Sequence, residues 1–358
     1  MHTLFRHIVL AFAAATLALA GCSKQPVAEQ DGAEINFSAS AVWLESGTKS
    51  GGTLDERTQF GNGDRIIVSA WHHRKSEPVF ENNNRQEVTK TAVDPWSYSP
   101  KKKWRWEDSD YYDFFAVPNG VSATPTNGEP FSLSVSYDAT ASQYDLMMAG
   151  TRHKISDSNP SRVVDLDFQH MLSAVKVIFY KYTGGEAVVV TSYHFTDLVV
   201  SADVTGYWDD GYKRFDSRLS NTIRLDTEQF GENRIEPWTN PANYLTNSTT
   251  PYDPEFFDLL LPQDLDPDSG APSLVVRYMD NVDKDPYDGK FLPTEYTSEL
   301  IPLKNIPVKG TTDQFITRWE AGHKYIYEVH ILFNGGVLVD VVTTEWDEVL
   351  AQTPGLMI

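Results

Sequence analysis

The chain has 358 residues, of which 41% are hydrophobic, and its 50 acidic and 30 basic residues give a formal net charge of −20. Beyond its signal-like start this length suits two domains, and the acidic balance disfavours nucleic acid and anionic lipid surfaces as partners. The 17 tyrosines, 18 phenylalanines and 9 tryptophans favour strands over helices. The single cysteine excludes an internal disulfide.

The first 22 residues have the pattern of a secretory signal. Arg6 lies in a short basic head, and the apolar run Ile8–Leu19 is too short to span a bilayer as a mature helix. Leu19-Ala20-Gly21-Cys22 is similar to a bacterial lipobox, which predicts cleavage before Cys22 and attachment of lipid to it. The alternative is an ordinary signal peptide whose cleavage site includes the cysteine.

Residues 23–34 are polar and predict a flexible tether. Ile35–Val42 then alternates apolar and small polar residues, which predicts a strand, and the glycine-rich segment Glu45–Arg57 predicts an exposed loop. Residues 201–255 are rich in Asx and aromatic residues and predict long loops. Further strands are expected at Arg65–Trp71, Tyr111–Pro118, Phe131–Tyr137, Tyr144–Gly150, Val163–Phe168, Ala174–Tyr180, Val188–Val190, Phe195–Val200, Phe256–Leu261, Leu274–Tyr278, Tyr325–Phe333 and Val337–Val342.

The strands are short and separated by turns, and no stretch has a sustained 3.6-residue period. This pattern predicts an all-β chain of antiparallel sandwiches rather than a parallel sheet. The polar residues 151–161 predict a boundary, which places one β-sandwich at 35–155 and a second at 160–358. Asn334-Gly335 predicts a hairpin turn in the second.

The sequence lacks the common catalytic signatures: G-x-S-x-G, H-E-x-x-H, Walker A and C-x-x-C. No nucleophile–base pair supports an exported hydrolase, so we expect no enzyme activity, no cofactor and no metal centre. His72-His73 is expected to face solvent, and His170 to be a structural histidine. The acidic loops with Asp264, Asp266 and Asp268 and with Asp283, Asp285 and Asp288 depart from the EF-hand pattern and are expected to be solvated, with loose calcium binding as the alternative.

Trp96, Trp104 and Trp106 surround the basic run Lys101–Lys103. These tryptophans are expected to plug the end of a sandwich core. Alternatively, they form a stacking platform for sugar rings, which would make the chain a surface glycan-binding lipoprotein. The lysines are expected at a solvated hairpin tip, or they dock an acidic neighbour.

Five motifs follow one another along the chain: Ile35-Asn36-Phe37-Ser38-Ala39-Ser40, Phe60-x-x-Gly63-Asp64-x-Ile66-x-Val68, Tyr112-Asp113-Phe114-Phe115-Ala116-Val117-Pro118, Leu166-x-Phe168-x-His170-x-Leu172-Ser173 and Trp319-x-Ala321-Gly322-x-x-Tyr325-x-Tyr327. In this order they resemble the fimbrillin (type V pilin) family of the Bacteroidales, including its accessory and anchor lipoproteins. The resemblance implies two tandem transthyretin-like β-sandwich domains in a non-enzymatic pilus subunit, or a tip or anchor subunit, that mediates adhesion. It also implies an outer-membrane lipoprotein whose partners are other fimbrial subunits and a host or bacterial surface receptor.

In polymerising members of this family a trypsin-like protease cuts after arginine or lysine in the loop behind the first strand, and a neighbour's strand fills the groove. Here the resemblance implies a displaced strand with Ile35, Phe37 and Ala39, and a cut after Lys49 or Arg57. The glycines around Lys49 favour it slightly over Arg57, because they give an extended, accessible backbone. The C-terminal segment Val337–Ile358 is a candidate replacement strand, although acidic residues, proline and glycine interrupt it.

Overall fold

The computed structural model is almost entirely β. It describes residues 34–40, 43–44, 56–57, 60–73, 76–92, 96–104, 111–153, 163–181, 188–225, 230–234, 244–245, 257–266, 270–280, 294–332 and 336–345. Within these ranges the chain forms 28 strands and one short helix, α2 (Glu81–Asn84). No helix in the described ranges has the length and apolar character needed to cross a bilayer. The expected all-β class is confirmed.

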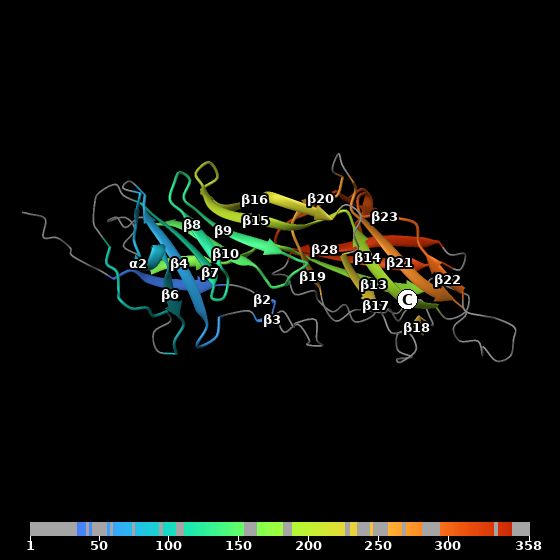
Figure 1. Ribbon diagram of the computed structural model, residues 1–358, viewed down its shortest axis with the longest axis horizontal. Coiled ribbons are helices and arrows are strands. Elements are labelled where there is room, and N and C mark those ends of the chain that lie inside the picture. Colours follow the sequence, from blue (N-terminus) through green and yellow to red (C-terminus); the bar gives the residue numbers. More distant parts are fainter. Residues whose placement is uncertain are drawn as a thin grey trace, which may run out of the picture.

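Two large sheets form one part of the molecule, around β4, β7 and β9 in Figure 1. The central sheet has the order β12 (Gln169–His170), β10 (Met147–His153), β7 (Tyr112–Pro118), β4 (Arg65–His72) and β5 (Glu77–Pro78), with β6 (Gln86–Thr89) also paired to β4. The second sheet has the order β16 (Arg214–Leu225), β15 (Leu198–Asp209), β9 (Ser132–Asp138) and β8 (Ala123–Thr126).

Two further sheets form the other part of the molecule, around β13, β14, β21 and β28 in Figure 1. One has the order β19 (Asp258–Leu260), β13 (Ser173–Lys181), β27 (His323–Ile331) and β28 (Val337–Glu345). The other has the order β17 (Phe230–Arg234), β14 (Val188–Thr196), β21 (Ser273–Asp280) and β22 (Thr294–Thr297), with β18 (Tyr244–Leu245) on β14 and β23 (Ile301–Pro302) on β21.

The remaining strands form pairs. These are β1 (Asn36–Ser40) with β11 (Val163–Asp167), β2 (Trp43–Leu44) with β3 (Glu56–Arg57), β20 (Gln263–Asp264) with β26 (Arg318–Trp319), and β24 (Ile306–Pro307) with β25 (Phe315–Ile316). Most pairings are antiparallel, as expected, but β1 pairs with β11 and β13 pairs with β27 in parallel.

Strand β7 is buried on both faces, which explains the apolar run from Phe114 to Val117. Because side chains alternate across a strand, Phe115 and Val117 face a large core, whereas Phe114 and Ala116 face a smaller one. We call the smaller one the β1 core. It consists of Ile35, Phe37, Phe60, Ile66, Val68, Ala70, Phe80, Val88, Trp96, Tyr98, Trp104, Tyr112, Phe114, Ala116, Met147, Ala149, Val164, Leu166 and Phe168.

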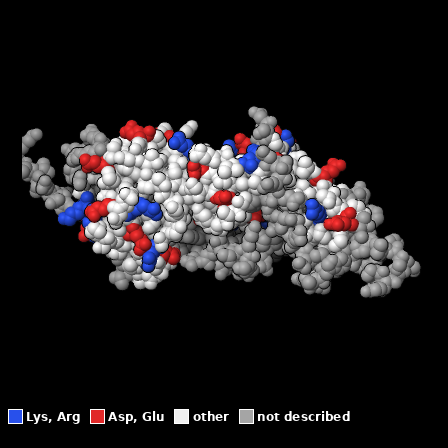
Figure 2. Space-filling view, viewed as in Figure 1, with Lys and Arg blue, Asp and Glu red and all other residues white. Residues whose placement is uncertain are grey.

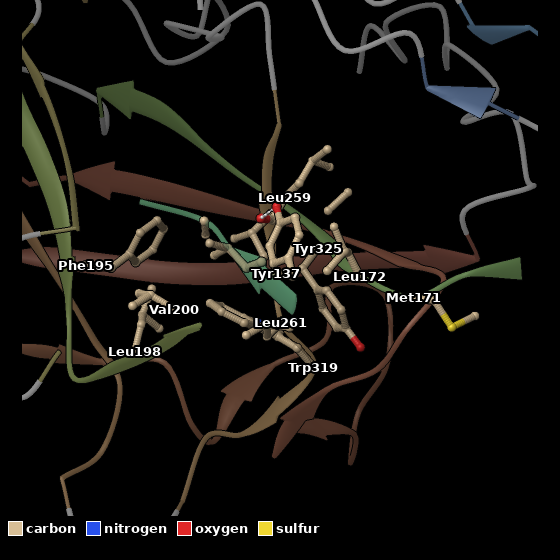
Figure 3. Packing of buried hydrophobic residues seen from close by; sticks show 14 of the residues in the cluster. Tyr137, Met171, Leu172, Phe195, Leu198, Val200, Leu259, Leu261, Trp319 and Tyr325 are labelled. Atoms are coloured by element: carbon tan, nitrogen blue, oxygen red, sulfur yellow. Dashed lines mark hydrogen bonds between the residues drawn. The ribbon is translucent and has the colours of Figure 1, made fainter. Parts of the chain in front are cut away.

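The large core is continuous between the two parts of the molecule. It includes Leu133 and Tyr137 of β9 as well as Val177 of β13 and Trp319 of β26. The hydroxyl of Tyr137 donates a 2.8 Å hydrogen bond to the backbone oxygen of Leu259, and Figure 3 shows both among the packed apolar side chains. Residues far apart in the sequence therefore share one apolar interior.

Strands on the two sides of residues 155–160 pair with each other. β1 is hydrogen bonded to β11, β10 to β12, and β9 to β15. The two predicted sandwiches therefore share sheets, and the division at 155–160 stays a prediction.

The predicted loops at 201–255 are wrong over residues 201–225. This segment contains most of the β15–β16 hairpin, which lies along the long axis of the molecule in Figure 1 (yellow). Strand β16 was missed because polar residues dominate its sequence, although its four apolar residues fall on alternate positions; most of its side chains are exposed or half-buried. The predicted strand Phe195–Val200 is also wrong, because the chain turns at Asp197 between β14 and β15. The remaining predicted strands correspond to observed ones, with boundaries that differ by a few residues.

Candidate functional site

The first strand forms where its alternating sequence predicts it, and among the described strands it pairs with one, β11. β1 pairs with β11 from Asn36↔Val163 to Ser40↔Asp167. On its opposite side the described contacts are at its start, where the amide of Ile35 donates to the oxygen of Lys102 (2.9 Å) and Glu34 bridges Lys103. Most of this edge has no ladder of strand hydrogen bonds among the described residues.

Apolar side chains hold β1 against the rest of the chain. Ile35 is 0% exposed and Phe37 is 2% exposed. The Phe37 ring packs against Phe80, Tyr98 and Phe114, with centroid distances of 6.5, 5.6 and 5.9 Å. Burial of a side chain of this size stabilises the folded chain by about 1.5–3 kcal/mol. Ala39 packs against the same core and is partly buried. The three residues expected on the inner face of the strand are thus in contact with the β1 core.

We call the groove that holds β1, formed by β11, the β1 core and Lys101–Lys103, the β1 seat. Tyr98 lies at the start of this seat. Its hydroxyl donates a 2.8 Å hydrogen bond to the oxygen of Ile35 and accepts one of 3.3 Å from the amide of Lys102. Burial raises the pKa of Tyr98 to about 12, so the hydroxyl keeps its proton at neutral pH.

The basic run Lys101–Lys103 borders the beginning of β1, so the expected solvated hairpin tip is wrong for Lys101 and Lys102. The Lys101 ammonium lies 4.6 Å from the centre of the Tyr98 ring and 3.4 Å from Asn36 Oδ1. Lys102 Nζ forms a 2.7 Å ion pair with Glu81 Oε1, which lowers the pKa of Glu81.

Two carboxylates border the other end of β1. Ser38 Oγ donates to Asp165 Oδ1, and Ser40 Oγ donates to Asp167 Oδ1 at 2.8 Å. The amide of Phe168 also donates to the oxygen of Ser40 at 2.9 Å. Sequence reasoning missed both aspartates, although Val163-Val164-Asp165-Leu166-Asp167 alternates in the way that places acids on the outer face.

The expected processing residues lie mostly beyond the described ranges. Cys22 and Lys49 fall outside them. Arg57 belongs to β3, where its backbone is paired with Trp43 of β2. A trypsin-like protease binds its substrate in an extended form, so a cut after Arg57 requires this pairing to open.

Of the three tryptophans proposed as a platform, the two in the described part of the chain are buried. Trp96 is 3% exposed and Trp104 is 5% exposed, and both belong to the β1 core. Their rings pack edge-on against Phe60 and Tyr112, respectively. Neither indole face is available to a sugar ring in this structure, and Trp106 lies outside the described residues.

The histidines have structural surroundings. His170 Nδ1 lies 2.8 Å from Asp145 Oδ1 in a buried pair, as expected for a structural histidine. The expectation that His72 faces solvent is wrong, because it is 3% exposed and packs on the Tyr112 ring. His73 Nδ1 lies 2.8 Å from the buried carboxylate of Asp113.

The described residues contain no group of three or more His, Cys, Asp or Glu side chains that could hold a metal ion. Of the two acidic loops, Asp264 pairs in β20 and Asp266 forms an ion pair with Lys304. Asp268, Asp283, Asp285 and Asp288 lie outside the described residues. On the face in Figure 2, basic and acidic side chains are interspersed over the described surface, without a large field of one sign.

Comparisons with known proteins give one family. A family model described as fimbrillin-like matches residues 53–346. None of the curated proteins compared with the chain matches it. A solved structure of a candidate cell adhesion protein from Bacteroides uniformis is 14% identical, with a TM-score of 0.43, over 87% of this chain and 98% of its own. The C-terminally truncated tip fimbrial protein Mfa3 of Porphyromonas gingivalis is 9% identical, with a TM-score of 0.39, over 80% of this chain and 95% of its own.

Proposed function

The chain belongs to the fimbrillin-like family, and on this basis we propose that it is a non-enzymatic subunit of a surface fimbrium that contributes to adhesion. It would serve as a stalk, tip or anchor component with other fimbrial subunits as partners. One observation carries the proposal: β1 fills a core with apolar side chains, yet it pairs along its length with a single described strand, β11.

Removal of β1 would open a groove that favours the binding of another strand. It would uncover the rings of Phe80, Tyr98 and Phe114 together with the backbone groups of β11 that now pair with β1. Unpaired backbone groups beside apolar side chains accept an added strand. We infer that proteolysis after Lys49 or Arg57 releases β1 and that a strand from a neighbouring subunit replaces it.

The order of the processing residues suits an anchored precursor. Lipid on Cys22 would hold the uncut chain at the outer membrane. Both Lys49 and Arg57 follow Cys22 and β1 in the sequence, so one cut would separate the folded subunit from its lipid and also free the groove.

Part of the candidate replacement segment, Val337–Ile358, already belongs to a sheet of this chain. Val337–Glu345 of the candidate segment already forms β28, which pairs with β27 over its full length. Residues 346–358 of that segment lie outside the described residues. A donor strand from this segment would therefore come from these residues or require β28 to leave its sheet.

Limited digestion of a lipid-free chain with an Arg/Lys-specific protease tests the proposal. We expect one early cut after Lys49 or Arg57, loss of the fragment that contains β1, and SDS-resistant oligomers on unheated gels. Mass spectrometry locates the cut. Lys49→Gln and Arg57→Gln serve as matched variants: the one that removes the true site should abolish both the early cut and the oligomers.

The presence or absence of SDS-resistant oligomers distinguishes a self-polymerising stalk subunit from other types of subunit. A clean cut without a ladder indicates a tip subunit or one that awaits the strand of a different subunit. Resistance of residues 45–57 to the protease, together with cuts elsewhere, would overturn release of β1.

A further inference from the structure

We propose that the charges at the two ends of the β1 seat select the strand that refills it and fix its direction. This inference rests on the proposed strand replacement and adds the chemistry of the partner. The occupant would be a strand of another subunit that runs parallel to β11. It would have an acidic residue at its start, large apolar residues at the Ile35 and Phe37 positions, and hydroxyl or basic side chains at the Ser38 and Ser40 positions.

The acidic end of the seat belongs to β11. Val164 and Leu166 point into the β1 core, so the intervening Asp165 and Asp167 lie on the exposed face. Each of these carboxylates accepts a hydrogen bond from a serine of β1. An incoming acid at either position would place two carboxylates in contact, whereas a hydroxyl or an ammonium would supply a donor.

The basic end of the seat lies where β1 begins. Lys103 is opposite Glu34 in an antiparallel bridge, and the Lys101 ammonium faces Asn36 Oδ1. Lys102 is engaged with Glu81 and offers its backbone oxygen instead. The first residue of the occupant therefore meets positive charge.

The basic and acidic ends together favour one strand direction in the seat. A strand in the orientation of β1 places its acid near the lysines and its donors near the aspartates. The same strand in the opposite orientation would bring its acid toward Asp167 and its hydroxyls toward the lysines. Like-charge contacts at an interface strongly disfavour wrong partners, so the reversed orientation should be rejected.

The chain's own tail matches this chemistry poorly. Aligning Glu348 with Glu34 gives the best fit within residues 346–358, with Val349 in place of Ile35 and Gln352 in place of Ser38. However, Ala351 then occupies the site of the Phe37 ring, and Pro354 occupies the position of Ser40 and has no amide to donate. A strand from a different subunit therefore fits the seat better than the tail of a second copy.

Peptide binding to the chain after removal of β1 tests this selection. A recognition site for a protease that cuts nowhere else is inserted between residues 45 and 55 of the full mature chain. The chain is cut, and the released strand is exchanged for labelled peptides followed by fluorescence anisotropy. The peptides are residues 33–41, the same peptide with Ser38→Asp and Ser40→Asp, its reversed sequence, and residues 345–358.

The native peptide should bind at least about tenfold more tightly than the other three, since like-charge contacts and unfilled apolar sites each disfavour binding by at least that factor. The cut double variant Asp165→Lys/Asp167→Lys should reverse the preference between the native and the aspartate peptide. This variant is expected to fold, because serine can accept a hydrogen bond from lysine as readily as it donates one to aspartate.

The outcomes separate the two proposals. If the native peptide fails to bind, the groove cannot be refilled, and strand replacement is overturned together with selection. If all four peptides bind equally, or if the charge-reversed protein keeps the original preference, selection by charge is overturned and strand replacement stands. Tighter binding by the tail peptide would assign the occupant to a second copy of this chain and overturn the inference.

Discussion

Among single residues, Asp113 has a fully buried charge, with 0% of its side chain exposed. Its two oxygens lie 2.5 Å from Arg152 Nε and 3.1 Å from Arg152 Nη2. We predict that Arg152→Met lowers the free energy of unfolding by about 3–5 kcal/mol, because it leaves a buried carboxylate without its main partner. Arg214→Met is the matched control: its partner Asp216 is near the surface, so we expect a change of about 0–1 kcal/mol. Urea denaturation measures both, and equal losses would contradict the prediction.

Tyr98 gives the β1 seat a sensitivity to alkaline pH. Burial raises its pKa from 10.0 to about 12 in the folded chain. A group with a raised folded-state pKa contributes stability that is fully present below its unfolded pKa and is lost as pH rises through its folded pKa. We therefore predict that stability falls between about pH 10 and pH 12 and that Tyr98→Phe makes this fall less steep.

Denaturation at a series of pH values measures the slope. Part of the loss of stability at alkaline pH should remain in Tyr98→Phe, because other buried tyrosines, such as Tyr325, also have raised pKa values. Tyr212→Phe is the control, because its ring is 76% exposed and has no comparable burial. A profile for Tyr98→Phe that coincides with that of the parent chain would show that this hydroxyl is not the cause. At neutral pH the variant also loses the hydrogen bond to Ile35, worth about 0.5–1.5 kcal/mol.

At the scale of elements, the sequence predicts the strands in which apolar residues dominate, and it misses β16, in which polar residues dominate. β1, β4 and β27 form where apolar residues alternate in the sequence, and β7 forms around the apolar run Phe114–Val117. The apolar residues of β16, Phe215, Leu219, Ile223 and Leu225, all fall on alternate positions, but polar residues fill the rest of the segment and only Phe215 is buried. Its position depends on hydrogen bonding to β15, which is a property of the hairpin rather than of the strand alone.

The Phe215 ring of β16 packs closely against Gly206 of β15 and Gly150 of β10. A Cβ atom added at Gly150 would lie 2.2 Å from Phe215 Cδ2, and one added at Gly206 would lie 2.5 Å from Phe215 Cζ. Phe215 is 6% exposed and packs against Phe115, so its ring has little space to move. We predict that Gly206→Ala lowers the free energy of unfolding by about 1–3 kcal/mol through overpacking.

Gly128→Ala is the matched control for this overpacking. No atom lies within 4 Å of the added Cβ at that position. Urea denaturation of both variants compares them directly. If Gly206→Ala proves as stable as Gly128→Ala, the hairpin is packed less tightly against β10 than the structure indicates.

At the scale of the whole molecule, the sequence predicts the first strand of the candidate site but not its surroundings. The serines of β1 and the aspartates of β11 are 127 residues apart, and alternation in each strand gives no sign of which other strand it pairs with. The tryptophans show the same limit: their spacing suits an exposed platform as well as a core, and only the long-range packing around Phe60 and Tyr112 distinguishes the two. A parallel partner for β1 has no local signature, because no turn joins the two strands.

The pairing across residues 155–160 also determines how the chain should unfold. A fragment that ends at residue 155 lacks β11, which pairs with β1, and β15, which pairs with β9. It also lacks Phe215 of β16, which packs against Phe115 in the continuous core. We predict that this fragment does not fold alone and that the full chain unfolds in a single cooperative transition. Urea denaturation followed by tryptophan fluorescence and by circular dichroism tests both statements. A fragment with its own cooperative transition, or two separate transitions in the full chain, would show that each predicted sandwich is stable alone and that the shared sheets add little to its stability.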